Sequence, residues 1–141
     1  MKLSEHFDSS EFDCHGNGID CHCGGQGHNM NPILIKLLEQ LKKNCGGYPL
    51  YITSGYRCPT HNANVGGASQ SQHKLWNACD IACPYELDYG EFRWYCENVS
   101  ISDDDGTRLH FDAIGNYPKG MFVHVDVRDN GRGQQFTFQG A

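Results

Sequence analysis

The feature of this sequence that most limits its possible folds is the joint abundance of cysteine and histidine, eight of each in 141 residues. In a secreted chain, eight cysteines predict a framework of disulfide bonds. In a reducing compartment they predict metal ligands or buried thiols. The sequence alone leaves both alternatives open, so the question is which of these side chains carry chemistry.

Length, charge and hydropathy exclude several classes of protein. A chain of 141 residues that is 38% hydrophobic can bury one modest core, so we expect a single domain over residues 1–141. The net charge of −6 argues against a nucleic-acid partner, because phosphates call for a basic surface. No apolar run approaches the roughly 18 residues that span a bilayer, and the first residues contain no apolar signal core. We therefore expect neither membrane insertion nor a secretion signal.

Hydrophobic periodicity predicts one clear helix and several short strands. Asn31 is a good N-cap, Pro32 suits the first helical position, and an apolar stripe continues to Leu41. Further helices are expected over 59–65 and 85–99. Strands are expected over 50–53, 78–82, 110–114, 122–127 and 135–138. Because strands and helices do not alternate regularly, the prediction is an α+β fold with a small, mostly antiparallel sheet and flanking helices.

The first 30 residues form a polar, Gly-rich arm that we expect to pack on this domain. It contains a candidate second metal site, whose proposed ligands are Cys14, Cys21, Cys23 and His28. Their spacing matches none of the usual zinc-finger patterns, so disulfides or free thiols remain alternatives. Cys45, Cys58 and Cys96 belong to no motif and are expected to be small core residues.

A second group of polar residues lies in apolar surroundings. His73 ends a Gly-rich loop, Asp80 lies in an apolar strand, and His124 alternates with valines. A buried carboxylate needs a partner, and three protein ligands with one open position are typical of a catalytic zinc site. The simpler alternative is that each residue is a hydrogen-bonded group of the core.

The exact residues are more specific than their spacing. The segments SGYRCPTHN (54–62), SQH (71–73), ACD (78–80) and FVHVD (122–126) resemble the zinc D-Ala-D-Ala carboxypeptidase family of peptidoglycan metallopeptidases, in its compact bacterial and phage branch. The resemblance covers nearly the whole chain and implies the hedgehog/DD-peptidase fold. It also implies Zn²⁺ ligands, a charge-stabilising arginine and substrate-binding residues. The implied Zn²⁺ ligands are His73, Asp80 and His124. The implied charge-stabilising residue is Arg57, and the implied substrate-binding residues are Ser71 and Tyr56.

Two positions depart from the family pattern. Trp76 stands where the family usually has Gly, three residues after the first ligand, and a bulky ring there is expected to alter the pocket rim or the loop path. Met121 stands where many members place an acidic general base, three residues before the last histidine. Asp126, about 6.5 Å along the strand from His124, is our candidate base, and Asp112 is the other. Alternatively, Asp126 only orients His124.

The sequence therefore predicts a zinc metallopeptidase that hydrolyses peptidoglycan stem peptides by zinc-activated water. The bond is D-Ala-D-Ala or another stem bond, such as L-Ala-D-Glu. The expected setting is an endolysin-like, prophage-encoded monomer, made in the bacterial cytoplasm and acting at the cell wall. One zinc ion would be catalytic; a second, structural zinc in the arm is one alternative, beside disulfides or free thiols. The alternatives are a catalytically inactive zinc-containing module that binds cell wall or protein, and a metal-free disulfide protein.

Overall fold

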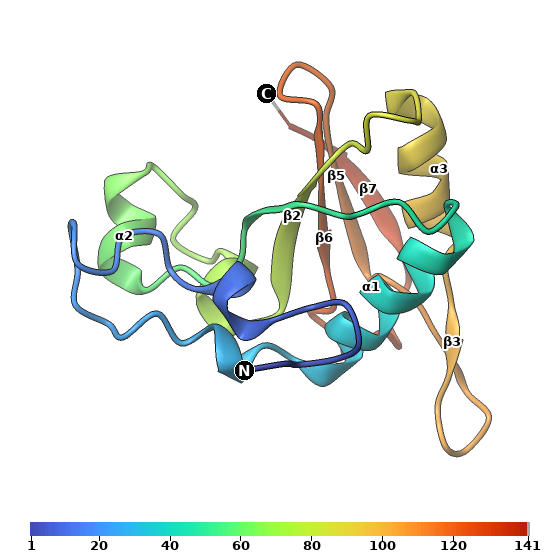
Figure 1. The fold of residues 1–141 in the computed structure, drawn as a ribbon, viewed down its shortest axis with the longest axis horizontal. Coiled ribbons are helices and arrows are strands. Elements are labelled where there is room, and N and C mark those ends of the chain that lie inside the picture. Colours follow the sequence, from blue (N-terminus) through green and yellow to red (C-terminus); the bar gives the residue numbers. More distant parts are fainter. Residues whose placement is uncertain (141) are drawn as a thin grey trace.

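A five-stranded sheet lies at the centre of the computed structural model, which describes residues 1–140. Its strands run in the order β1-β2-β6-β5-β7. Their bounds are β1 Ile52–Ser54, β2 Ala78–Ala82, β5 Ala113–Tyr117, β6 Phe122–Asp126 and β7 Phe136–Gln139. All neighbours are antiparallel except β5 and β7, which are parallel. The predicted α+β fold with a mainly antiparallel sheet is confirmed (Figure 1).

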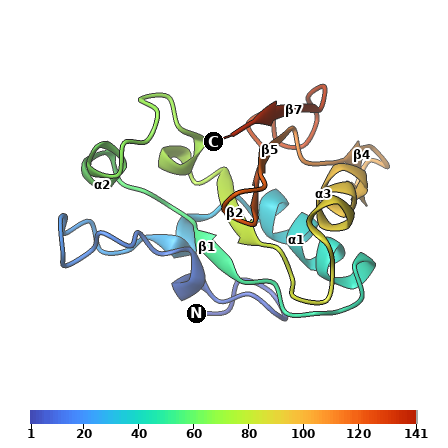
Figure 2. The same cartoon turned by 90° about the horizontal axis from the view of Figure 1, so that it is seen from above.

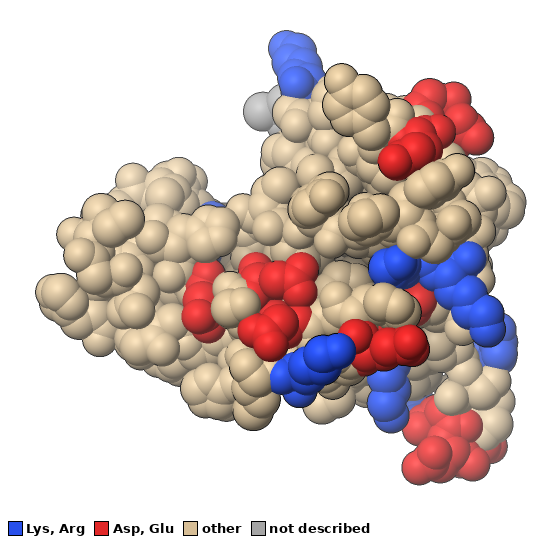
Figure 3. Space-filling model, viewed as in Figure 1, with Lys and Arg blue, Asp and Glu red and all other residues tan. Residues whose placement is uncertain are grey.

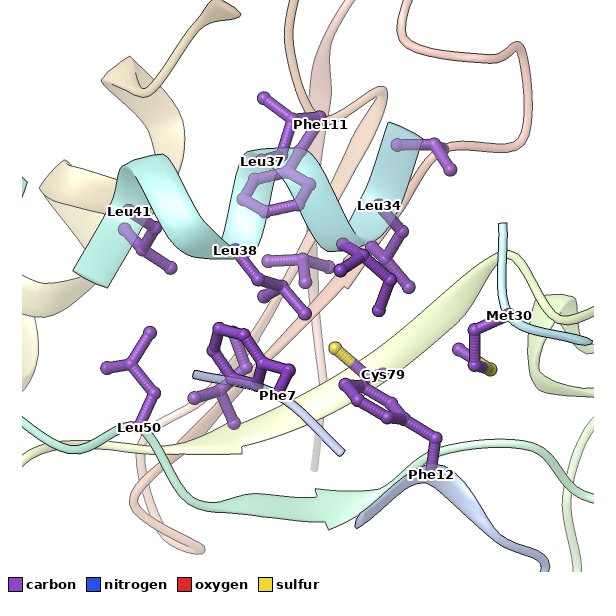
Figure 4. Close-up of a cluster of buried hydrophobic side chains, with 14 of the residues drawn as sticks. Phe7, Phe12, Met30, Leu34, Leu37, Leu38, Leu41, Leu50, Cys79 and Phe111 are labelled. Atoms are coloured by element: carbon purple, nitrogen blue, oxygen red, sulfur yellow. The ribbon is translucent and has the colours of Figure 1, made fainter. Parts of the chain in front are cut away.

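The helix α1 (Pro32–Asn44) supplies much of the core. The Asn31 side chain accepts the N–H of Ile33, and Pro32 occupies the first position, as predicted. The apolar stripe of α1 is buried against the sheet and against two phenylalanines of the N-terminal arm (Figure 4). The stripe and these partners are Leu34, Leu37, Leu38, Leu41, Phe7 and Phe12.

The helix α3 (Tyr89–Asn98) contacts α1 and strands β5 and β6. It begins four residues later than the predicted start at 85. The reason is a capping box at Asp88, whose side chain accepts the N–H of Glu91 while the Glu91 side chain accepts the N–H of Asp88. Figure 2 shows α1 and α3 beside one another next to the sheet.

One predicted strand is displaced in the structure, and two short strands were not predicted. The strand expected over 110–114 is β5 at Ala113–Tyr117, because the residues before it form a different set of hydrogen bonds. His110 donates its N–H to Gly131, and the Asp112 carboxylate accepts the N–H groups of a loop. The two-residue strands β3 (Ile101–Ser102) and β4 (Arg108–Leu109) flank the acidic turn and were not predicted.

The N-terminal arm packs on the domain and contributes residues to the core. Two short 3-10 helices, η1 (Ser9–Phe12) and η2 (Gly27–Asn29), shape it, and Phe7 and Phe12 are fully buried. The outer loop of the arm lies beside α2 (Pro59–Asn64) (Figures 1 and 2). On the face drawn in Figure 3, acidic and basic side chains are interspersed, without a continuous basic surface. Within residues 1–140, no helix is long and apolar enough to cross a membrane.

Candidate active site

Asp80 and His124 face each other across the antiparallel pair β2 and β6. Side chains alternate along a strand, so their neighbours Cys79 and Val123 point to the opposite face, into the core. Nδ1 of His124 lies 3.0 Å from Oδ1 of Asp80. The pairing register therefore brings two predicted ligands together on the face of the sheet that is turned away from the core.

His73 reaches the same point from the 3-10 helix η3 (Gln72–Leu75). Ser71 caps this helix, its Oγ accepting the N–H of His73 at 3.2 Å. The ring Nδ1 lies 2.7 Å from the carbonyl oxygen of Gly55, which can only accept, so Nδ1 carries the proton. In the neutral ring, Nε2 is then unprotonated and its lone pair is free to bind a metal. It is buried, has no hydrogen-bond partner, and lies 3.3 Å from Oδ1 of Asp80.

These three side chains fit a zinc ion. One ligand atom from each of His73, Asp80 and His124 lies within 4.8 Å of the others. Two imidazoles and a carboxylate form a donor set that zinc accepts, with one position left for water or substrate. An unpartnered buried nitrogen such as Nε2 of His73 is costly unless something binds it. The three predicted ligands are therefore brought together, and a buried orphan atom points into the space between them.

Charge within the cluster is balanced by close hydrogen bonds. Burial alone would raise the pKa of Asp80, but the hydrogen bond with His124 and the nearby His73 ring outweigh burial and hold this pKa well below the usual range. Burial alone would lower the pKa of His124, but hydrogen bonds to Asp126 and Asp80 raise it. The site thus keeps the carboxylates of Asp80 and Asp126 ionised, and negative charge suits a divalent cation.

Asp126 lies behind His124, away from the other two ligands. Its Oδ2 is 2.8 Å from Nε2 of His124, and its side chain is fully buried. Both carboxylate oxygens also accept hydrogen bonds from the guanidinium of Arg128. This placement does not fit the predicted role of Asp126 as a base that meets water. It fits the alternative, in which Asp126 fixes the proton on Nε2 and turns Nδ1 toward the metal position.

Asp112, the other candidate base, also lies outside the site. Its buried carboxylate accepts backbone N–H groups from Asp129, Gly131 and Gly133 at 2.8–2.9 Å. These bonds shape the loop between β6 and β7, so Asp112 has a structural role.

A cavity of about 540 Å³ opens over the three ligands. Arg57 lines it, and Nε of this arginine is buried without a hydrogen-bond partner. Burial lowers the pKa of Arg57, although the charge of Asp80 opposes this shift. Ser71 also lines the cavity, as predicted. The result is a pocket with the three candidate metal ligands on one wall and an unpaired guanidinium on another.

A family model described as Peptidase M15 matches residues 5–126, which include all three candidate ligands and Arg57. The chain belongs to the Peptidase M15 family. The predicted resemblance is thereby confirmed, and with it a metallopeptidase acting on peptidoglycan in general, from a family that is zinc-dependent in general. The comparison with curated proteins finds no match.

In this M15 peptidase, Tyr56 does not lie where it was predicted. Tyr56 is only 4% exposed, is not among the residues that line the cavity, and stacks on the Trp76 ring at 4.5 Å with an interplanar angle of 4°. A substrate-binding role for Tyr56 therefore stays a prediction that the cavity lining does not support. Its backbone N–H donates to Phe12 of the arm, so Tyr56 ties the arm to the domain.

The backbone conformation of Trp76 bears on its departure from the family pattern, in which this position is usually Gly. Its backbone has φ 59° and ψ 21°, in the left-handed region that glycine adopts without steric cost. Trp76 adopts this left-handed conformation and packs its ring on Tyr56, outside the residues that line the cavity. The turn after His73 thus accommodates a tryptophan where the family usually has Gly.

Tyr117 and Phe138 are pocket residues that the sequence did not indicate. Tyr117 ends β5, stacks on Phe122 at 4.5 Å and lines the cavity. Phe138 lines it from β7. The predicted strand over 110–114 stopped short of Tyr117, so nothing in the sequence pattern placed this ring on the site's face of the sheet.

The second predicted cluster differs at one ligand. Cys14, Cys21 and Cys23 lie together, as expected. The side chain that joins them is Cys58, whereas His28 is exposed and lies outside the group. Cys58 was expected in the core, because its position far along the chain gave no sign that it meets the arm.

Proposed function

We propose that this M15 peptidase is a zinc-dependent hydrolase of peptidoglycan stem peptides, acting at D-Ala-D-Ala or at another stem bond such as L-Ala-D-Glu. The observation that carries the proposal is the buried, unpartnered Nε2 of His73, aimed at Asp80 and His124 beneath an open cavity. When bound there, zinc polarises a scissile carbonyl and lowers the pKa of water to about 7.

The protein's own residues hold the metal position rigidly. His73 presents Nε2 because the Gly55 carbonyl holds the proton on Nδ1. Asp126 accepts the Nε2 proton of His124, so Nδ1 is the atom that would bind zinc once it has lost its own proton. Each imidazole therefore has one nitrogen held by a neighbouring acceptor, the kind of contact by which proteins orient histidine ligands.

Arg57 supplies the positive charge that a stem peptide needs. Its guanidinium lines the cavity, and within residues 1–140 it forms no salt bridge with a carboxylate. A planar fork of donors suits a terminal carboxylate, or the carbonyl oxygen that gains charge during attack. Arg128 also lines the cavity, but its guanidinium is occupied by Asp126. Arg57 is therefore the cation we assign to substrate.

A second candidate function is a zinc-containing binding module without catalysis. The observation in its favour is that Asp80 is the one carboxylate among the described residues that line the cavity. As a metal ligand, Asp80 is not free to accept a proton, and the exposed Met121 occupies the family's usual base position. The same pocket would then hold a stem peptide without cutting it.

Digestion of defined stem peptides separates the two functions. Purified protein is incubated with muropeptides that end in D-Ala-D-Ala and with muropeptides that lack this end, each with zinc or with chelator. Mass spectrometry then identifies the products. If the protein is a hydrolase, we expect a product that disappears with chelator and with His124→Ala. The control His110→Ala changes a histidine that does not line the cavity, so the product should remain. Absence of product from every stem peptide, with binding retained, would establish the second function instead.

A further inference from the structure

Four cysteine thiols meet where the N-terminal arm touches the segment before α2. Three come from the arm, Cys14, Cys21 and Cys23, and the fourth is Cys58, directly after Arg57. One sulfur from each lies within 4.8 Å of the others, and all eight cysteines of the chain are free. Cys14, Cys21 and Cys58 are buried and Cys23 is half-buried.

The spacing of the sulfurs fits a central ion. Sγ of Cys21 lies 3.8 Å from Sγ of Cys14 and 3.7 Å from Sγ of Cys23. A tetrahedron with zinc–sulfur bonds of about 2.3 Å has sulfur–sulfur edges of about 3.8 Å. A disulfide requires about 2.05 Å, so these contacts are much too long for bonds between the sulfurs. Thiols that only fill a core have no reason to converge four at a time.

The backbone around the thiols is shaped to keep them together. Gly16 has no room for a side chain, because a Cβ there would lie 2.0 Å from Oδ1 of Asp20 and 2.5 Å from Nδ1 of His61. Asp20 and His61 themselves pair at 3.0 Å, joining the arm to α2. Sγ of Cys58 accepts the N–H of His61, the kind of bond that stabilises a thiolate. The loop and the helix therefore converge on the sulfur cluster from both sides.

We propose that Cys14, Cys21, Cys23 and Cys58 bind a structural zinc ion. Four thiolates complete a tetrahedral site and leave no position for water or substrate, so this metal is structural rather than catalytic. Binding of zinc at Cys58 would also hold the three residues before it, which are Gly55, Tyr56 and Arg57. Gly55 orients His73, and Arg57 lines the active-site cavity. The zinc thus fastens the arm to the segment that positions two parts of the active site.

The proposal is tested by metal content, which does not depend on hydrolysis. Mass-spectrometric metal analysis of the wild type, grown with zinc, should give two zinc ions per chain. The variant His73→Ala/His124→Ala should retain one. Adding Cys14→Ser/Cys58→Ser should remove it, whereas adding Cys83→Ser, a half-buried cysteine outside the cluster, should not. A His73→Ala/His124→Ala protein without zinc would overturn the thiolate site.

Two measurements on intact chains keep the test independent of whether the cysteine variants fold. In the His73→Ala/His124→Ala protein, cobalt in place of zinc should show thiolate-to-cobalt charge-transfer absorption, because only the thiolate site remains. A mercurial thiol reagent should release one zinc per chain from the wild type as it titrates the thiols. Absence of the charge-transfer band, or disulfides found among these four cysteines, would contradict the proposal.

Discussion

Nε2 of His124 lies 2.8 Å from Oδ2 of Asp126, on the side of the ring away from Asp80. Because this contact fixes the ring and its proton, we predict that Asp126→Ala weakens zinc binding at the active site by about 10–100-fold. Competition with a chromophoric chelator measures the affinity. Asp129→Ala, at an exposed position in the loop that follows β6, is the control and should bind zinc as the wild type does. Equal affinity in the wild type and Asp126→Ala would show that the contact does not orient the ligand.

Arg57 provides a second prediction, on kinetics. Arg57→Ala should lower kcat/KM by about 10²–10³-fold on stem peptides, since one donor to a developing charge is lost. Arg57→Lys keeps the charge but loses the planar fork, so it should be intermediate. Zinc content should not change in either variant. Lys74, a cation that does not line the cavity, supplies the control Lys74→Ala. Wild-type kcat/KM in Arg57→Ala would remove Arg57 from the site.

Trp76 allows the turn and the stacking contact to be separated. Trp76→Ala loses the packing on Tyr56, and we expect it to cost about 2–3 kcal/mol of unfolding free energy. Trp76→Gly loses the same packing but relieves the left-handed backbone, so it should be about 1 kcal/mol more stable than Trp76→Ala. Urea denaturation of the two variants measures the difference. If Trp76→Ala were the more stable of the two, the turn would not be strained.

Glu39 connects stability to pH at the start of the arm. Its carboxylate accepts hydrogen bonds from Ser4 and from the backbone of His6. Burial opposes the effect, but these bonds hold the pKa of Glu39 below its usual value. Because the folded pKa is the lower one, the stabilisation is present above the unfolded pKa of about 4.3 and is lost as pH falls through the folded pKa.

We therefore predict that Glu39→Gln costs about 1–2 kcal/mol of unfolding free energy at pH 7, and that its difference from the wild type shrinks toward acidic pH. Thermal unfolding across this pH range measures it. Glu5→Gln, at an exposed position, is the matched control and should follow the wild type. A Glu39→Gln deficit that stays constant into acid would mean that the ionised carboxylate is not the source.

The features that could be predicted from the sequence are those set by the alternation of polar and apolar residues along strands and by the family motifs. His124 and Asp80 each lie within an apolar strand, so the sequence pattern by itself indicates that each needs a polar partner. Partners chosen by long-range packing were not predictable. Cys58 meets the arm only because the chain folds back beside α2, and Tyr56 packs on Trp76 although the next residue, Arg57, lines the site. The position of Asp126 on the strand was correct, but its role depended on Arg128, two residues further on.

The central claim is that His73, Asp80 and His124 hold a zinc ion that makes this M15 peptidase a hydrolase of stem peptides. Its most direct test is to strip the wild type of metal and add zinc back stepwise, following zinc occupancy and product release by mass spectrometry in the same samples. The account predicts no product without metal, full hydrolysis once the two sites are filled, and none at any zinc level for His73→Ala/His124→Ala. Hydrolysis by the metal-free protein, or by that variant, would contradict it.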